Sequence, residues 1–280
     1  MQLDEWHASG EHRDLAGHRI FTRVEGTGPW LTLLHGFPTS SWDFARVAPL
    51  LAPQRRLLAL DFLGYGASAK PRDHTYTIGV QADIVEALWR HHGVTETTVL
   101  AHDYGDTVAL ELLARGAPAV RRVMFLNGAI IGRLNRMLFI QKLLRVPGIG
   151  AVLTRLVSEG RFAANFRTIF SAEHPISDAD IHQHWRSICL AGGNKLYHRL
   201  VYFYDDIERF EERWEGALAA ARVPLRLVWG MGDPVSGPDM VAHIRTHAPA
   251  VSIHELPAIG HYPHLEVPDV VAEHVLVFDR

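Results

Sequence analysis

The chain has 280 residues, of which 48% are hydrophobic, and its formal net charge at pH 7 is -3. This length fits one large α/β domain with an insertion, and the even mixture of charges indicates neither nucleic acid nor a membrane as partner. The single cysteine excludes an internal disulfide. The first residues lack the basic and apolar regions of a secretory signal, and no apolar run reaches membrane-spanning length, so we expect a cytoplasmic protein.

Short apolar runs alternate with amphipathic helical patterns along most of the chain. This alternation predicts a mostly parallel sheet with helices on both faces. Strands are predicted over residues 18–24, 30–34, 55–60, 97–102, 122–127, 225–229 and 251–255. Helices are predicted over residues 41–51, 77–92, 104–115, 237–246 and 264–279.

The strand predicted over 97–102 runs directly into Asp103, and a helical pattern starts immediately after it. Small residues stand two places before and two places after, at Ala101 and Gly105. A strand, a sharp turn with small flanking residues and a helix together form a nucleophile elbow, which presents one reactive side chain. Asp103 is therefore the predicted nucleophile.

An aspartate at this position predicts a particular chemistry. Asp103 is ionised at neutral pH and needs no base in order to attack. Its useful target is a saturated carbon with a strained or good leaving group, and the product is an alkyl ester that water can then hydrolyse. The sequence therefore predicts a two-step displacement on an epoxide or an alkyl halide.

The loop His35-Gly36-Phe37-Pro38 follows another predicted buried strand. In a fold built around a nucleophile elbow, this loop supplies one backbone N–H to the oxyanion hole, and the residue after the nucleophile supplies the second. We therefore expect the amides of Phe37 and Tyr104 to stabilise the intermediate that forms when the Asp103 ester is hydrolysed.

The alternation of strands and helices stops between residues 130 and 215, where helical patterns alone are found. We interpret this segment as a helical cap, or lid, inserted after the sixth strand of a core formed by residues 1–129 and 216–280. Such an insertion would cover a pocket at the carboxyl ends of the strands, where open α/β sheets bind ligands.

Asp233 and His261, which both follow the insertion, complete a predicted catalytic triad with Asp103. Asp233 follows the strand predicted over 225–229, and His261 follows the last strand. The order nucleophile, acid, histidine is the order that this architecture uses. We expect His261 to activate water for the second step and Asp233 to orient its imidazole ring. No step requires a cofactor, and the paired histidines of the chain lack a recognisable third metal ligand, so no metal is predicted.

The segments HGFPTSSWDF, DFLGYGAS, AHDYGD, GMGDP and GHYPHLE resemble the α/β-hydrolase branch that contains epoxide hydrolases and haloalkane dehalogenases. HDYGDTVALELL, IQKLLRVPGIGAVLTRL and RWEGALAA bring the chain closer to the mesoderm-specific transcript proteins and their bacterial relatives. The resemblance implies an eight-stranded, mostly parallel sheet with an inserted cap, and a small apolar electrophile as substrate.

The resemblance also implies which side chains would stabilise each of the two leaving groups, an epoxide oxygen or a halide. Epoxide hydrolases protonate the epoxide oxygen with lid tyrosines, and Tyr204 and Tyr197 are the candidates here. Dehalogenases hold the halide with a Trp after the nucleophile and an Asn or second Trp, whereas this chain has Tyr104 and Phe37 at the corresponding positions. Epoxide hydrolysis is therefore the preferred prediction. Pocket positions are expected for His35, Trp42, His102 and Trp185.

Two alternatives remain open at this point. Trp42 and Trp185 could serve a halide, which keeps a haloalkane or haloacid dehalogenase as the runner-up. A hydrolase scaffold that only binds a small molecule is the non-enzymatic alternative, although a complete triad argues against it. The protein is expected to be a monomer or a homodimer.

Overall fold

The computed structural model describes residues 1–278 of the chain. These residues form one eight-stranded sheet in the order β1-β2-β4-β3-β5-β6-β7-β8. The pairs β1–β2 and β2–β4 are antiparallel, and all other neighbouring strands are parallel. The strands are β1 (Glu11–Leu15), β2 (His18–Glu25), β3 (Trp30–Leu34), β4 (Arg56–Leu60), β5 (Thr97–His102), β6 (Val120–Leu126), β7 (Leu225–Gly230) and β8 (Ser252–Leu256). The predicted mostly parallel sheet is confirmed.

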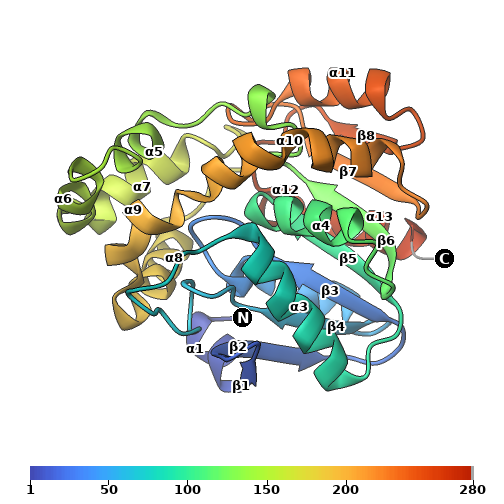
Figure 1. Cartoon of the computed structure of the whole chain (residues 1–280), viewed down its shortest axis with the longest axis horizontal. Coiled ribbons are helices and arrows are strands. Elements are labelled where there is room, and N and C mark those ends of the chain that lie inside the picture. The colour runs from blue at the N-terminus through green and yellow to red at the C-terminus, as the bar shows by residue number, and fades with distance from the viewer. Residues whose placement is uncertain (279–280) are drawn as a thin grey trace.

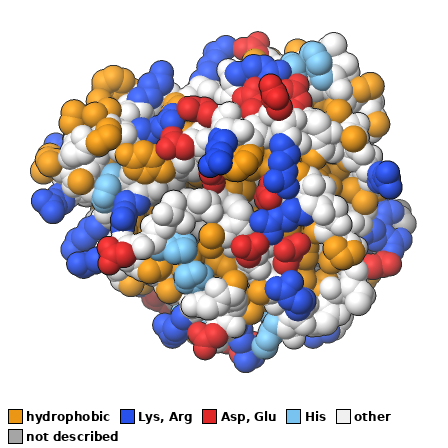
Figure 2. All heavy atoms as spheres, in the orientation of Figure 1, with side chains coloured by type: hydrophobic (Ala, Val, Ile, Leu, Met, Phe, Trp, Pro, Cys, Tyr) orange, Lys and Arg blue, Asp and Glu red, His pale blue; other side chains and the backbone are white. Residues whose placement is uncertain are grey.

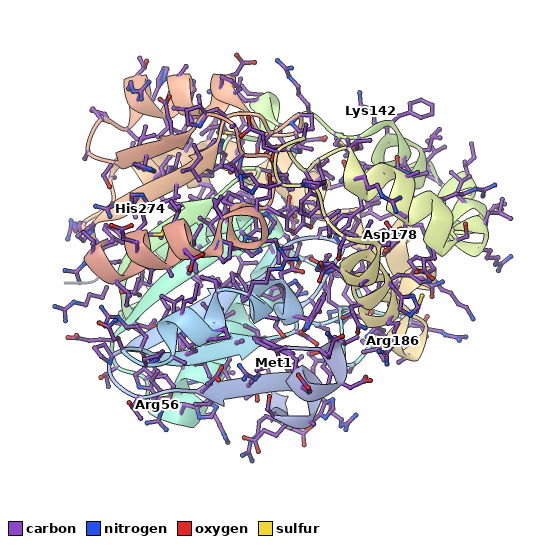
Figure 3. The ribbon with its side chains drawn as sticks, turned by 180° about the vertical axis from the view of Figure 1, so that it is seen from behind. Met1, Arg56, Lys142, Asp178, Arg186 and His274 are labelled. Carbon is purple, nitrogen blue, oxygen red and sulfur yellow. The ribbon has the colours of Figure 1, made fainter. Side chains whose placement is uncertain are left out.

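Each face of the sheet carries its own hydrophobic core, because successive side chains along a strand point to opposite faces. In β5, Val99 and Ala101 belong to one core, and Leu100 belongs to the other. The first face is covered by α3 (Ile78–His92) and α4 (Tyr104–Ala114), and the second by η1 (Ser41–Ala45), α2 (Ala48–Leu51) and α13 (Pro268–Phe278). Figure 1 shows α3 and α4 in front of the sheet, and the view from behind in Figure 3 shows α13 on the opposite face.

Some predicted elements differ from the structure. The edge strand β1 was not predicted, because Leu15 is its only apolar residue and therefore gives no periodic signal. The helix predicted over 41–51 is divided into η1 and α2. The helix predicted over 264–279 is divided into α12 (Pro263–Glu266) and α13, because Pro268 interrupts the helical hydrogen bonding. Residue 279, the predicted end of that helix, lies outside the described residues together with residue 280.

The chain between β6 and β7 contains only helices among the described elements. They are η2 (Gly132–Leu134), α5 (Phe139–Leu144), α6 (Ile149–Leu156), α7 (Glu159–Arg167), α8 (Asp178–Cys189), η3 (Leu190–Leu196), α9 (Tyr197–Leu200) and α10 (Phe203–Ala219), while α11 (Pro238–His247) follows β7. The predicted boundary at residue 215 falls inside α10. In Figure 1, α5 and α6 lie at the end of the molecule farthest from β7 and β8.

A buried carboxylate joins α10 to the helix that follows the elbow. The indole N–H of Trp214 donates to Glu111 in α4 over 2.8 Å. The guanidinium groups of Arg115 and Arg213 donate to the other oxygen of Glu111, over 2.8 Å and 3.2 Å. Because Glu111 and Trp214 are both buried, this contact fixes α10 against α4.

Replacing Glu111 with alanine should lower the free energy of unfolding by about 2–3 kcal/mol, because the buried Trp214 N–H loses its acceptor. Urea denaturation measures this loss, and Glu111→Gln, which keeps an acceptor oxygen, should lose less. The control is Glu96→Ala, which removes an exposed ion pair with Arg121 and should cost less than about 1 kcal/mol. Equal losses for the two alanine variants would contradict this account of Glu111.

Candidate active site

The turn after β5 is a strained elbow centred on Asp103. Asp103 has φ 52° and ψ -110°, a conformation that a residue other than glycine rarely adopts. Glycines make room for it on two sides. A Cβ atom at Gly105 would lie 2.2 Å from the carbonyl oxygen of Leu34, and one at Gly128 would lie 2.7 Å from the Cα atom of Asp103. The backbone is therefore packed so closely at the elbow that neither position has room for a side chain.

The loop after β3 reaches the same carboxylate. The backbone N–H of Phe37 donates to Asp103 Oδ1 over 2.7 Å. His35 holds the start of this loop, since its Nε2 atom accepts from the backbone N–H of Phe62 over 3.0 Å. Tyr104 is the first residue of α4, and its role as the second oxyanion donor remains a prediction.

The structure brings Asp103, His261 and Asp233 together from three separate loops. His261 Nδ1 lies 2.7 Å from Asp233 Oδ2, and His261 Nε2 lies 3.4 Å from Asp103 Oδ2. The imidazole ring thus bridges two carboxylates, and all three side chains are buried. This is the geometry that a nucleophile, a base and an orienting acid require.

Further hydrogen bonds hold Asp233 in place. Its Oδ2 atom accepts from Asn127 Nδ2 over 2.9 Å and from the Ser236 hydroxyl over 2.7 Å, and its Oδ1 atom accepts from the Val235 N–H over 2.8 Å. Asn127 also exchanges two hydrogen bonds with the backbone of Gly230, at the end of β7. Sequence reasoning missed these roles of Asn127 and Ser236; the position of Asn127 immediately after a predicted strand was the available signal.

The three titratable groups stabilise one another's charged forms. Burial acts to lower the pKa of His261, but the charges of Asp233 and Asp103 outweigh it and raise this pKa to about 10. Burial acts to raise the pKa of Asp233, but the charge and hydrogen bond of His261 lower it to about 2. The pKa of Asp103 likewise lies below its usual value, because the contact with His261 overcomes the effect of burial. The resting site therefore contains an imidazolium between two carboxylates.

A cavity of about 280 Å³ opens onto Asp103 and His261. Its wall is largely apolar and comes mainly from helices α5, α6 and α7. The lining residues are Phe37, Pro38, Asp103, Leu138, Ile140, Gln141, Leu144, Leu153, Leu156, Val157, Arg161, Phe162, Ala164, Asn165, Phe166, Ile169, Tyr197, Val235 and His261. Such a wall suits a small, apolar molecule with one reactive centre.

Of the two predicted tyrosines, only Tyr197 lines this cavity. It is buried, and its hydroxyl has no hydrogen-bond partner among the described residues. The hydroxyl of Tyr204 instead accepts from Asn135 over 3.2 Å and donates to Gln141 over 3.4 Å. Tyr197 and Tyr204 are seven residues apart but do not share one helical face, because the helix is interrupted at Val201, between α9 and α10.

Four residues predicted to line the pocket do not lie in the cavity wall, which corrects that prediction. His35 supports the loop before Phe37, and His102 faces away from the cavity, with its Nε2 atom 2.9 Å from the carbonyl oxygen of His261. Trp42 packs edge-on against His184, and Trp185 packs against Phe162 from outside. Trp42 instead lines a separate cavity, together with Phe170 and His184.

The histidine loop is tied to the helical segment above it. The backbone N–H of His261 donates to the carbonyl oxygen of Ile169 over 2.8 Å. The Glu266 carboxylate accepts from the N–H groups of Gly260, Tyr262 and Ser171, over 3.1 Å, 3.3 Å and 3.0 Å. One carboxylate thus joins the loop that carries His261 to the chain between α7 and α8.

Within residues 1–278, one group of side chains has donor atoms close enough together to hold a metal ion. Ligand atoms of Asp43, His102 and His264 lie within 4.8 Å of one another, and all three side chains are fully buried. Burial lowers the pKa of His102 to about 3, so its ring is neutral. Sequence spacing could not reveal this group, because its members come from three distant segments. None of them faces the cavity, and the chemistry derived below does not use them.

The imidazole of His261 should stay protonated in the free protein up to about pH 10. ¹⁵N NMR of the ring nitrogens measures this titration, and the spectrum of His261→Gln identifies the signals. Asp103→Asn should lower this pKa, because one of the two neighbouring negative charges is removed. Since the folded pKa exceeds the unfolded value of about 6.5, the stabilisation from His261 is complete below pH 6.5 and is lost as the pH rises through 10. A titration near pH 6.5 in wild-type protein would contradict the buried three-charge arrangement.

Comparison with known proteins identifies the family to which the chain belongs. The family model for the alpha/beta hydrolase fold matches residues 29–268. LipZ of Mycobacterium tuberculosis is 39% identical over 278 residues, covering 97% of this chain and 96% of LipZ. The human mesoderm-specific transcript homolog protein is 37% identical over 282 residues, covering 95% of this chain and 84% of that protein. The crystal structure of haloalkane dehalogenase DbeA from Bradyrhizobium elkani has the same fold, with a TM-score of 0.83, 24% identity and coverage of 96% and 97%. The predicted resemblance is confirmed, and the chain belongs to the α/β-hydrolase fold family.

Proposed function

We propose that this hydrolase opens small apolar epoxides to diols through a covalent ester on Asp103. The observation that carries the proposal is the ionised Asp103 carboxylate on the elbow, in contact with both the Phe37 amide and His261 at an apolar cavity. A carboxylate in this position attacks saturated carbon, and the resulting ester can be hydrolysed by water activated nearby. Residues 130–215 act in this proposal as the lid of the cavity.

In the first step, a carboxylate oxygen of Asp103 attacks an epoxide carbon and the carbon–oxygen bond of the ring breaks. The epoxide oxygen takes a proton from the Tyr197 hydroxyl, which lies in the cavity wall without another partner. Burial raises the pKa of Tyr197 well above its usual value, so the phenol carries its proton before the reaction. The imidazolium of His261 then returns a proton to Tyr197 and becomes neutral.

In the second step, neutral His261 removes a proton from water, and the hydroxide attacks the carbonyl carbon of the Asp103 ester. Ester formation has removed the charge of Asp103, so only Asp233 still favours the imidazolium, and the pKa of His261 is lower than in the free protein. The Phe37 amide stabilises the oxyanion, with the predicted help of the Tyr104 amide. Collapse releases the diol and restores the Asp103 carboxylate and the His261 imidazolium.

The donors around the cavity favour an epoxide over a halide. A halide leaving group needs N–H donors, but the side chains of Phe37 and Tyr104 provide none. Besides His261, the lining residues with side-chain N–H groups are Gln141, Arg161 and Asn165. Arg161 and Asn165 already donate to backbone carbonyl oxygens, of Leu156 over 2.8 Å and of Arg161 over 2.9 Å. Dehalogenation is therefore the second candidate function, and the next experiment distinguishes it from epoxide hydrolysis.

The His261→Gln variant should accumulate the Asp103 ester, because ester hydrolysis loses its base, whereas attack by Asp103 and proton donation by Tyr197 come before any step that uses His261. The variant is incubated with styrene oxide, 1,2-epoxyoctane or 1-bromohexane, and its intact mass is measured. We expect a mass gain equal to a whole epoxide that maps to Asp103 after proteolysis. Asp103→Asn/His261→Gln is the matched control and should gain nothing.

Each other result assigns a different chemistry. A gain equal to the hexyl group alone would identify a dehalogenase. No adduct, combined with turnover of a carboxylic ester by the wild-type protein, would refute the alkyl-ester mechanism. Saturable binding of these compounds without an adduct or turnover would indicate a binding protein that has kept the hydrolase fold.

Tyr197→Phe should slow ester formation from styrene oxide by about 10²–10⁴-fold, because the departing oxygen loses its proton donor. Rapid quenching of the His261→Gln background followed by mass measurement gives this rate. Tyr204→Phe is the matched control and should slow it less than about 10-fold, since this hydroxyl binds Asn135 and Gln141 instead of facing the cavity. A larger effect at Tyr204 would reassign the proton donor.

A further inference from the structure

Exposed apolar side chains gather on the two outermost helices of the insertion. Nine large apolar side chains are exposed among the described residues, and five of them lie between residues 139 and 156. We call this surface the α5–α6 patch; it consists of Phe139 (75% exposed), Val146 (39%), Ile149 (49%), Val152 (56%) and Leu156 (53%). Soluble proteins seldom leave apolar groups contiguous in this way unless the surface binds something.

The patch follows the helical repeat of α6. Ile149, Val152 and Leu156 are three and four residues apart, so they share one side of the helix. The opposite side packs inward, where Gly150 and Thr154 are buried. At Gly150 a Cβ atom would lie 2.1 Å from the carbonyl oxygen of Leu144, so α5 and α6 are in close contact. The apolar side chains are therefore held outward by a packed pair of helices.

The charge around the patch is positive. No Asp or Glu occurs between residues 112 and 158, whereas this segment contains eight Arg and Lys residues. Lys142 and Arg155 are exposed beside the patch, and their side chains have no ion-pair partner within residues 1–278. Arg145 differs, because Asp205 and Glu208 of α10 both pair with it. Figure 2 shows apolar and basic side chains side by side at this end of the molecule, and Figure 3 shows Lys142 at its outer edge.

The patch is continuous with the cavity that contains Asp103. Leu156 belongs to both, because it is half exposed and also lines the cavity. The inward side chains of the same two helices, Leu144 and Leu153, form part of the cavity wall. An apolar molecule leaving a surface that covers the patch would therefore meet apolar side chains along its path to the nucleophile.

We propose that the α5–α6 patch docks on the surface of an anionic lipid bilayer, with the apolar side chains at the acyl boundary and Lys142 and Arg155 at the headgroups. An exposed apolar face flanked by cations, with no nearby unpaired acid, is complementary to such a surface. The contact would be peripheral, because no helix among the described residues is long and apolar enough to cross a membrane. Delivery of substrate from the bilayer to Asp103 rests in addition on the proposed function.

Vesicle sedimentation tests the docking without any reaction. Wild-type protein and Asp103→Asn should both bind vesicles of phosphatidylcholine and phosphatidylglycerol in equal parts, and bind vesicles of phosphatidylcholine alone at least about 10-fold more weakly. Phe139→Asp/Val152→Asp should reduce binding at least about 10-fold. Leu50→Asp/Val277→Asp adds the same charges to exposed apolar positions outside the patch and should leave binding unchanged. Circular dichroism checks that every variant is folded, and turnover of soluble styrene oxide is a second check for the variants that keep Asp103.

Lys142→Gln/Arg155→Gln should remove the preference for anionic vesicles and leave the weak binding to neutral ones. Equal binding of wild-type protein to both kinds of vesicle, or none to either, would overturn the proposal. A dimer that Phe139→Asp/Val152→Asp dissociates, without vesicle binding, would assign the patch to a second copy of this chain instead. No Asp103 ester in His261→Gln and no turnover of styrene oxide by the wild-type protein, with vesicle binding intact, would refute the proposed function but not the docking.

Discussion

A single imidazolium held between two buried carboxylates is the interaction on which the rest of this site depends. None of the three charges would be stable alone at this depth, because burial without a partner costs several kcal/mol. His261 contacts Asp103 through one ring nitrogen and Asp233 through the other, and the surrounding chain holds the three side chains in this arrangement. The strained backbone of Asp103, the Phe37 amide and the polar contacts of Asp233 can all be understood as positioning for this one arrangement.

The strand pattern and the closeness of Asp103, Asp233 and His261 were predictable for the same physical reason. Buried parallel strands produce apolar runs, and the residues that follow them meet at one edge of the sheet, so Asp103, Asp233 and His261 could be located from their places after strands. Features that depend on how helices lie could not be predicted. Helical periodicity shows which residues share a face but not what that face meets, which is why Trp42 and Trp185 were placed in the pocket and why Tyr204 and Tyr197 could not be told apart.

Averages over the chain also conceal local chemistry. A net charge of -3 spread over 280 residues gives no sign of a segment that lacks acids altogether. The acids that balance it lie elsewhere, many of them on α10 and the core, so the imbalance becomes visible only when α5 and α6 are seen at one end of the molecule. The expectation of no membrane partner followed from that average, and the proposed docking surface departs from it for a local reason.

The hydrogen bonds between the histidine loop and the chain above it restrict how the helical segment can move relative to the core. If the whole helical segment swung away as a rigid lid, Ile169 would leave the His261 amide and Ser171 would leave Glu266, so each opening would disturb the base. Among the described residues, helices α5 and α6 form no hydrogen bond with this loop; their side-chain contacts go to α9 and α10, through Thr154 with His198 and Gln141 with Tyr204. Opening of the cavity by motion of α5 and α6 would therefore break contacts inside the helical segment and leave Asp103, His261 and Asp233 assembled.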